Sequence, residues 1–281
     1  MTHVGFVGLG NIGRPMAQRL AMAGDPAIGD VVVFDVVPEA VAALEADGAI
    51  AAASVTELAA RVEVVCVMVR DDAQVRAVLD DVLAAGRPLT VVVHSTVAPE
   101  TPAALAEHAA PRGVLVVDAP VSGGAMGAAD GRLAIMVGGD EAGFAAARPV
   151  LDVLGGKVLH AGPIGAGTRF KLARNLMHFV AFTAATEAQR LAEATGIDLR
   201  ALGDVVRYTD AITGGPGAIM HRETAAPIAP DDFWFPIMDA VRILGEKDLG
   251  YAVELAHEHG VEVPLAELAL QRLGSGLGVG G

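Results

Sequence analysis

The sequence predicts an α/β protein in two parts: an N-terminal doubly wound sheet, then an all-α C-terminal domain that a long interdomain helix introduces. Three observations predict this. Short valine-rich runs alternate with helix-patterned segments over residues 3–162, no segment after residue 167 has a strand pattern, and residues 168–196 run without proline. Nearly continuous apolar strands are typical of a parallel sheet with helices on both faces.

The elements follow in order from apolar spacing and from glycine and proline stops. The expected strands are 3–8, 30–36, 62–69, 89–96, 114–120, 133–139 and 156–162. The expected helices of the sheet domain are 11–24, 38–48, 71–86 and 140–155, and those of the second part are 168–196, 199–209, 215–223, 235–260 and 264–273. We therefore expect one domain over 1–164 and a helical substrate and oligomerisation domain over 165–281, with a disordered glycine-rich tail at 274–281.

Composition excludes several classes of function. The net charge of −14 and the absence of a basic cluster argue against nucleic-acid binding, because that binding depends on the attraction of basic side chains to the phosphates. No apolar run has the length of a membrane span or follows the pattern of an export signal, so we expect a soluble cytoplasmic protein. The single cysteine, Cys66, lies in an apolar run and offers no disulfide or zinc site. The histidines have no convincing ligand spacing, so no metal is expected.

The segment "GLGNIG" predicts a dinucleotide site. It places Gly8, Gly10 and Gly13 in the pattern G-x-G-x-x-G between an expected strand and helix, and an acidic residue, Asp35, ends the second strand. In this Rossmann arrangement the glycines admit the pyrophosphate at the helix N-terminus and the acid binds the adenosine ribose. Because Val36, and not an arginine, follows Asp35, NAD is favoured over NADP.

Lys171 and Asn175 lie four residues apart on the expected long helix. A solvated lysine beside a surface amide is one interpretation. The apolar neighbours Leu172, Leu176 and Phe179 indicate burial and favour a functional one. Lysine serves as a general acid for a reduced carbonyl if burial lowers its pKa from about 10.4 toward neutrality.

The stretch "DAPVSGGAMGAADGRLAIMVGG" is unusually rich in glycine. A pair of tight turns explains it, and so does a cradle of backbone N–H groups that binds a small anion with help from the Ser122 hydroxyl. The residues alone leave both explanations open.

Four segments, "GFVGLGNIGRPMA", this glycine-rich stretch, "GAGTRFKLARN" and "EKDLGYAVELAHEHGVEVPL", resemble the signatures of the β-hydroxyacid dehydrogenases, which include 3-hydroxyisobutyrate dehydrogenase and tartronate semialdehyde reductase. The resemblance covers essentially the whole chain. It implies hydride transfer between NAD and a small 3-hydroxy carboxylic acid, by a Rossmann domain and a helical domain assembled as homodimers or homotetramers.

The resemblance also implies roles for individual residues. Lys171 matches the catalytic lysine, and Asn175 matches an asparagine that orients the substrate or that lysine. The expected substrate-binding residues are Ser122, Gly123, Gly124 and Lys247, of which the first three hold the carboxylate. The expected cofactor-binding residues are Gly8, Gly10, Asn11, Ile12, Gly13, Asp35, Met68, Val69, Thr96 and Lys247.

Three positions depart from the family's pattern: Arg70 stands where proline is common, His94 where aspartate is common, and Arg174 at the first of two usual asparagines. Residues 210–245 also match poorly, and in the family that region helps to line the substrate cleft. Two alternatives remain. One is a reductase of the same fold that acts on glyoxylate, succinic semialdehyde or an imine, and the other is a catalytically silent NAD-binding module. The retained Lys171 argues against an imine reductase and against a silent module.

Overall fold

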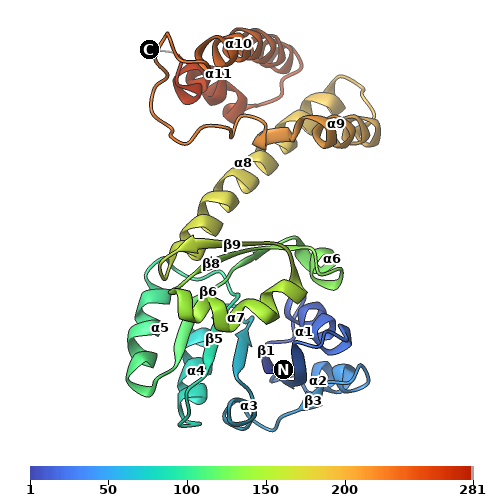
Figure 1. Ribbon diagram of the computed structural model, residues 1–281. Coiled ribbons are helices and arrows are strands. Elements are labelled where there is room, and N and C mark those ends of the chain that lie inside the picture. Colours follow the sequence, from blue (N-terminus) through green and yellow to red (C-terminus); the bar gives the residue numbers. More distant parts are fainter. Residues whose placement is uncertain (280–281) are drawn as a thin grey trace. The chain divides into compact units, whose positions relative to one another are not determined.

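The computed structural model describes residues 1–279 and divides the chain into two compact units, the first running from Met1 to Arg174 and the second beginning at Asn175 (Figure 1). The division falls beyond the boundary expected at residue 164. The reason is that the long helix α8 (Ala166–Ala194) begins within the first unit. There the Asp118 carboxylate accepts hydrogen bonds from the amide of Gly165, which directly precedes the helix, and from the amide of Thr168 in its first turn.

The first unit holds a single sheet whose strands run in the order β3-β2-β1-β4-β5-β6-β8-β7, with β9 also paired to β8. The strands are β1 Thr2–Val7, β2 Ile28–Phe34, β3 Ile50–Ala51, β4 Val64–Val67, β5 Thr90–Val93, β6 Leu115–Asp118, β7 Val121–Ser122, β8 Leu133–Gly138 and β9 Gly155–Gly162. The first six pair in parallel, in the 3-2-1-4-5-6 order of a Rossmann domain. β8 pairs antiparallel with β6 and β7. The predicted doubly wound sheet is confirmed.

Helices cover both faces of this sheet (Figure 1). They are α1 Gly13–Met22, α2 Pro38–Glu45, α3 Val55–Arg61, α4 Asp72–Leu83, α5 Thr101–Ala109, α6 Gly124–Ala129 and α7 Glu141–Leu154. Side chains alternate between the faces along β4: Cys66 joins the core under α1 and α7, and Val65 joins the core under α3, α4 and α5. Both faces of the strand are buried, which explains its unbroken apolar run.

Several short elements were not anticipated from the sequence. β3 and α3 fill residues 50–61, and β7 and α6 lie within the glycine-rich stretch. The helix expected at 215–223 is reduced to a single 3₁₀ turn, Gly215–Gly217. Glycine and proline dominate that turn and stop a regular helix from extending.

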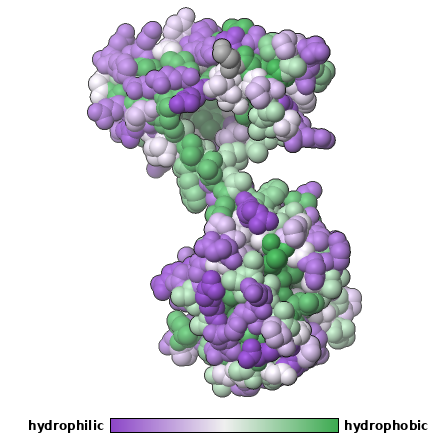
Figure 2. Space-filling view, turned by 90° about the vertical axis from the view of Figure 1, so that its left-hand side faces the viewer, coloured by the Kyte–Doolittle hydropathy of each residue, from purple (hydrophilic) through white to green (hydrophobic). Residues whose placement is uncertain are grey.

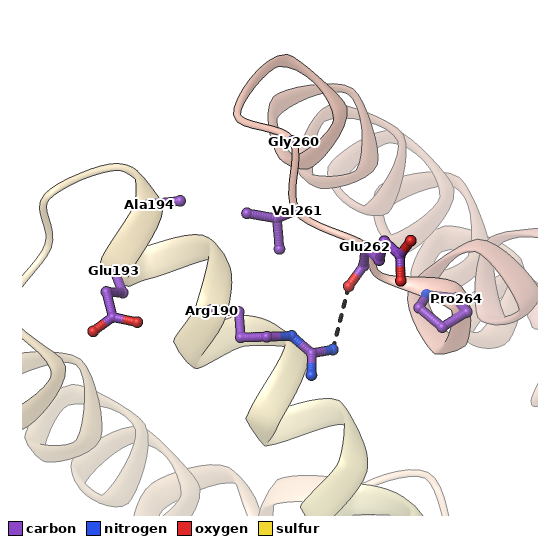
Figure 3. Close-up of a pocket in the computed structure, with 7 residues that line it drawn as sticks. All are labelled: Arg190, Glu193, Ala194, Gly260, Val261, Glu262 and Pro264. Carbon is purple, nitrogen blue, oxygen red and sulfur yellow. Dashed lines mark hydrogen bonds between the residues drawn. The ribbon is translucent and has the colours of Figure 1, made fainter.

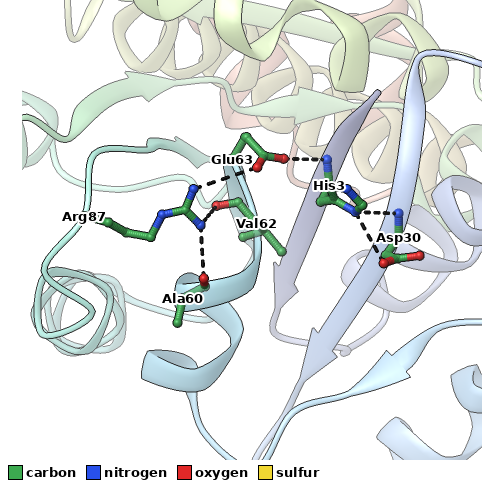
Figure 4. Close-up of polar contacts among 6 residues, drawn as sticks. All are labelled: His3, Asp30, Ala60, Val62, Glu63 and Arg87. Carbon is green, nitrogen blue, oxygen red and sulfur yellow. Dashed lines mark hydrogen bonds and ion pairs between the residues drawn. The ribbon is translucent and has the colours of Figure 1, made fainter.

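A polar network ties the strands together at the amino end of the sheet (Figure 4). The His3 amide donates to the Glu63 carboxylate at 2.8 Å, and the Asp30 amide donates to Nδ1 of His3 at 3.1 Å. Arg87 donates to two carbonyl oxygens around the end of α3, at 3.1 and 3.0 Å. This network lies at the opposite end of the strands from the edge where ligands bind in such sheets, so its role is structural.

The second unit contains the remainder of α8 with α9 Leu199–Thr213, α10 Phe235–Glu258 and α11 Pro264–Leu277. Glu187 on α8 is buried, and its carboxylate accepts the amides of Leu265 and Ala266 at 2.9 Å each, which caps the N-terminus of α11. The expectation of a disordered tail at 274–281 is wrong for residues 274–277, which are helical. The Leu277 side chain packs with Ile228 and Met238, and this burial holds the last turn. Gly280 and Gly281 lie outside the described residues.

Candidate active site

The glycine turn between β1 and α1 has the geometry of a pyrophosphate cradle. Gly8 has φ +95°, and a Cβ there would overlap the carbonyl of Met68. A Cβ on Gly13 would overlap the carbonyl of Gly8, so α1 can approach the turn only without a side chain. A Cβ on Gly10, in contrast, would meet no protein atom within 4 Å. Internal packing therefore explains Gly8 and Gly13, whereas Gly10 leaves space for a ligand.

Asp35 lies directly after β2 and holds the glycine turn in place. One of its carboxylate oxygens accepts the Leu9 amide at 2.6 Å, and the other accepts the Val37 amide at 2.8 Å. These contacts orient the carboxylate beside the turn, where an adenosine ribose would lie in a Rossmann domain. The sequence predicted that Asp35 binds the ribose, but it did not predict this structural role.

A groove of about 370 Å³ extends from the glycine turn across the ends of β2 and β4. Its lining contains five of the predicted cofactor-binding residues, Gly8, Gly10, Asp35, Met68 and Val69, together with Arg70. Its remaining lining residues are Val7, Phe34, Val36, Val55, Gln74, Ala77, Val78 and Asp81. The cradle and the groove together fit a dinucleotide.

The carboxyl ends of the next strands continue this edge. The buried Ser95 accepts the Val69 amide at 2.9 Å and donates to the Val69 carbonyl at 2.7 Å, which fixes the wall of the groove. His94 lies 2.8 Å through Nδ1 from the Ala119 carbonyl, so Nδ1 carries the proton. Burial lowers the pKa of His94 to about 4, and the imidazole is neutral near pH 7.

Asp118, at the end of β6, anchors the helix that carries Lys171. Its buried carboxylate accepts the Gly165 amide at 2.7 Å and the Thr168 amide at 2.6 Å. Burial raises the pKa of Asp118, and the two amides partly offset that increase. The negative charge lies at the positive end of the helix dipole, which stabilises the N-terminus of α8.

Lys171 lies one turn further along α8 and is only 8% exposed. Its Nζ donates to the Val121 carbonyl at 2.6 Å and to the Ser122 hydroxyl at 2.8 Å. Burial, and then the positive charge of Arg174, lower the pKa of Lys171 to about 8. The ammonium has three N–H donors, and these two hydrogen bonds use two of them. Within residues 1–279, the described hydrogen bonds of Lys171 therefore leave one N–H for a ligand.

The Lys171 contact brings the glycine-rich stretch into the site. Ser122 is half-buried, and the following residues, Gly123 and Gly124, are exposed with φ values of +136° and +63°. Successive glycines with positive φ turn the backbone at the start of α6 beside the lysine. Ser122, one of the predicted substrate residues, thus contacts the Lys171 amine, and Gly123 and Gly124 directly follow it in the chain.

The other predicted residues are placed as follows. Asn11 and Thr96 are exposed, and Ile12 is half-buried at the start of α1. Asn175 is half-buried and follows Lys171 by one helical turn of α8. Lys247 is exposed on α10 in the second unit, with its Nζ 3.0 Å from Asp248.

Three residues of the site were missed from the sequence. Asp118 and Ser95 position other groups, and Arg70, noted only as a departure from the family's pattern, lines the groove. Each lies at the C-terminal end of a parallel strand or within three residues of it, where the carboxyl edge of the sheet collects functional side chains. This position at the carboxyl edge of the sheet was the signal in the sequence from which they could have been predicted.

The second unit has a separate hollow of about 630 Å³ around residues 260–264 (Figure 3). Arg190 on α8 donates to the Glu262 carbonyl at 3.2 Å, so the hollow lies where α8 holds the loop before α11. Within residues 1–279, no three histidine, cysteine or acidic side chains are grouped to hold a metal ion. Of the helices described, none combines the length and apolarity needed to cross a membrane.

The comparisons agree with this architecture. Residues 3–162 match the NAD binding domain of 6-phosphogluconate dehydrogenase. Residues 165–280 match the family described as NAD-binding of NADP-dependent 3-hydroxyisobutyrate dehydrogenase. The fold and the glycine turn define the chain as an oxidoreductase with a dinucleotide-binding domain, and it belongs to the β-hydroxyacid dehydrogenase family.

Relatives cover nearly the full chain. An uncharacterized oxidoreductase of Mycobacterium tuberculosis is 50% identical over 281 residues, which is 99% of this chain and 94% of the relative. A 3-hydroxyisobutyrate dehydrogenase of Pseudomonas aeruginosa is 38% identical, covering 96% of this chain and 90% of the relative. The crystal structure of a putative oxidoreductase from Mycobacterium avium has a TM-score of 0.95 at 45% identity and covers 100% of both chains.

Proposed function

We propose that this protein is an NAD-dependent dehydrogenase that interconverts a small 3-hydroxy carboxylic acid, such as 3-hydroxyisobutyrate, and its semialdehyde or keto acid. Bound NAD would supply the acceptor for hydride from the carbon that carries the hydroxyl group. The observation that carries the proposal is the buried Lys171 amine, held against the Ser122 hydroxyl with its pKa lowered to about 8. A general acid and base near neutral pH has these properties.

The two hydrogen bonds of Lys171 support a defined proton path. In the neutral amine, two N–H groups remain for the Val121 carbonyl and the Ser122 hydroxyl, and the lone pair is available to the substrate. During oxidation, the hydroxyl proton passes to Nζ as the hydride leaves the carbon and the carbonyl forms. In reduction, the third N–H of the ammonium returns that proton to the alkoxide oxygen.

We assign the substrate carboxylate to the segment Ser122, Gly123 and Gly124. Positive φ at both glycines supports a backbone turn that presents N–H groups to an anion. We keep Asn175 as a residue that orients the substrate or Lys171, and Lys247 as a cation that contributes to the closed site. Asn11, Ile12 and Thr96 are assigned to the cofactor.

The pH dependence of turnover tests the function. The rate of NAD reduction is measured with 3-hydroxyisobutyrate, 3-hydroxypropionate, glycerate, 4-hydroxybutyrate and serine. With the accepted acid, we expect kcat/KM for oxidation to rise with pH and level off above about 8, because the neutral amine is the base. For the reverse reaction kcat/KM should fall above the same pH. A flat profile in both directions would contradict a lysine acid and base.

The alternatives give different results. An imine reductase of the same fold would reduce cyclic imines and leave every hydroxy acid untouched. A reductase of glyoxylate or succinic semialdehyde would consume reduced cofactor with those carbonyls. A silent NAD-binding module would bind the cofactor and turn over nothing. The buried, hydrogen-bonded Lys171 favours the dehydrogenase over the first and last of these.

Asp35 is expected to determine the preference for NAD. Its carboxylate would accept hydrogen bonds from the ribose and repel a 2′-phosphate. We expect Asp35→Asn to lower the preference for NAD over NADP by about tenfold, an effect of roughly 1.4 kcal/mol. Asparagine keeps one acceptor for the Leu9 amide, so the glycine turn is retained. Asp30→Asn, on the strand that precedes Asp35, is the control, and an unchanged ratio of the two dissociation constants in Asp35→Asn would refute the contact.

Exposed apolar side chains support assembly with further copies of the chain. Helix α9 has no buried residue, and Val205, Tyr208 and Ile212 on it are among its most exposed apolar side chains. Hydrophobic side chains are also exposed along α8, as the green surface of Figure 2 shows. A patch of this kind marks an association surface. We propose a homodimer or homotetramer, and a monomeric mass by light scattering at micromolar concentration would contradict it.

A further inference from the structure

The residues that line the groove beyond the glycine turn have a chemistry that suits one particular part of a dinucleotide. β1 lies between β2 and β4, so Asp35 and Arg70 stand on either side of the turn that follows β1. The walls between them are mostly apolar, formed by Val36, Val55, Val69, Ala77 and Val78. An apolar slot next to the Asp35 carboxylate, which would bind the ribose, suits the flat adenine ring. The phosphates belong at the glycine turn and the N-terminus of α1.

The main chain of Arg70 is held at the rim of this slot. Its amide donates to the Gln74 side chain at 2.9 Å, and the Asp71 carboxylate caps α4 by accepting the Gln74 amide at 2.9 Å. This reciprocal pair resembles a capping box and holds the backbone of Arg70 at the start of α4. The Arg70 side chain is 82% exposed, and its Nε lies 3.5 Å from Asp71. An exposed ion pair of that length is weak, so it does not hold the guanidinium against a ligand.

Charge distinguishes Arg70 from its neighbours. Among the residues that line the groove, all within the described part of the chain, Arg70 has the single positive charge and Asp35 and Asp81 are negative. A planar guanidinium both attracts the face of an aromatic ring and stacks on it. A lysine has the same charge but no plane to stack.

We infer that the Arg70 guanidinium stacks on the adenine ring of the bound dinucleotide and thereby sets the affinity for its adenosine half. This inference rests on the proposed use of NAD. It assigns a task to a position at which the chain departs from its family's pattern. It also explains how a strongly acidic protein retains an adenine nucleotide in a groove with two carboxylates.

Calorimetric titration with ADP-ribose and with AMP tests the inference, because both carry adenosine and neither carries nicotinamide. We expect Arg70→Ala to weaken ADP-ribose binding by about tenfold, between the effect of a cation on an aromatic face at an exposed site and at a desolvated one. Arg70→Lys should recover little of this loss. Arg61→Ala is the matched control: Arg61 is also exposed and paired with an acid, Glu57, but does not line the groove. Its affinity should equal that of the wild type.

Salt dependence separates stacking from pairing with a phosphate. If Arg70 stacks on adenine, the loss of affinity in Arg70→Ala should be nearly the same at low and high ionic strength. A contact with a phosphate would instead weaken as salt is added, because salt screens exposed charge pairs. A loss that lysine restores and that salt removes would overturn stacking in favour of a phosphate contact. Equal affinity of Arg70→Ala and wild type would remove Arg70 from the site. Failure of the wild type to bind ADP-ribose would instead refute the proposed use of NAD.

Discussion

Replacing Lys171 with methionine is expected to lower turnover by about 10³-fold while the protein still folds and binds NAD. Methionine matches the length of the lysine side chain and suits its buried surroundings, but it cannot exchange a proton. The hydroxyl proton of the substrate would then have no base, since the Val121 carbonyl and the Ser122 hydroxyl beside Nζ do not accept it at neutral pH. Initial rates with the accepted hydroxy acid, together with NAD titration, measure both effects.

Lys157→Met is the matched control for this change. Lys157 is exposed on β9, so its loss should leave the rate unchanged. Lys171→Arg provides a second comparison, since arginine keeps the positive charge but does not deprotonate in this pH range. We expect it to be as inactive as Lys171→Met. A Lys171→Met protein with near wild-type turnover would eliminate the lysine as the acid and base.

Replacing Gly167 with alanine is expected to destabilise the first unit by about 3 kcal/mol, at the upper end for overpacking. The added Cβ would overlap the Met136 carbonyl and lie 2.7 Å from the Asp118 carbonyl and 3.0 Å from the Gly138 amide. All three are backbone atoms of the sheet, so the start of α8 must move away. Lys171 lies one turn further on, and turnover should fall as well.

Gly250→Ala makes the same substitution inside α10, where a Cβ would meet no atom within 4 Å. Alanine should stabilise that helix by up to about 1 kcal/mol. Urea titration followed by circular dichroism compares both variants with the wild type. Equal stability of Gly167→Ala and wild type would show that α8 is not held against the sheet as the hydrogen bonds to Asp118 indicate.

The sequence predicted the sheet domain because its signals are local. Valine runs such as residues 62–69 are buried on both faces, and the glycine turn needs only three positions at fixed spacing. The long helix was predicted from 168–196 and observed at Ala166–Ala194. The short elements β3 and β7 were missed because two residues carry no periodicity, and they exist only through their neighbours β2 and β8.

The helical residues 274–277 also could not be predicted from local sequence signals. Residues 274–277 contain glycine and serine, and intrinsic propensity alone predicts no helix there. Burial of Leu277 against Ile228 and Met238 supplies the missing stability. Tertiary packing therefore stabilises a helix in residues whose intrinsic helix propensity is low.

The sequence by itself determined the fold class and the dinucleotide turn, and it predicted Lys171 as the candidate acid and base. Only the tertiary structure decided the chemistry of that lysine, because its pKa depends on burial and on the charge of Arg174. It also revealed Asp118, whose carboxylate caps a helix nearly fifty residues further along the chain, and the place of Arg70 in the groove. Spacing along a chain encodes what is local, whereas desolvation and contact between distant segments arise only when the chain has folded.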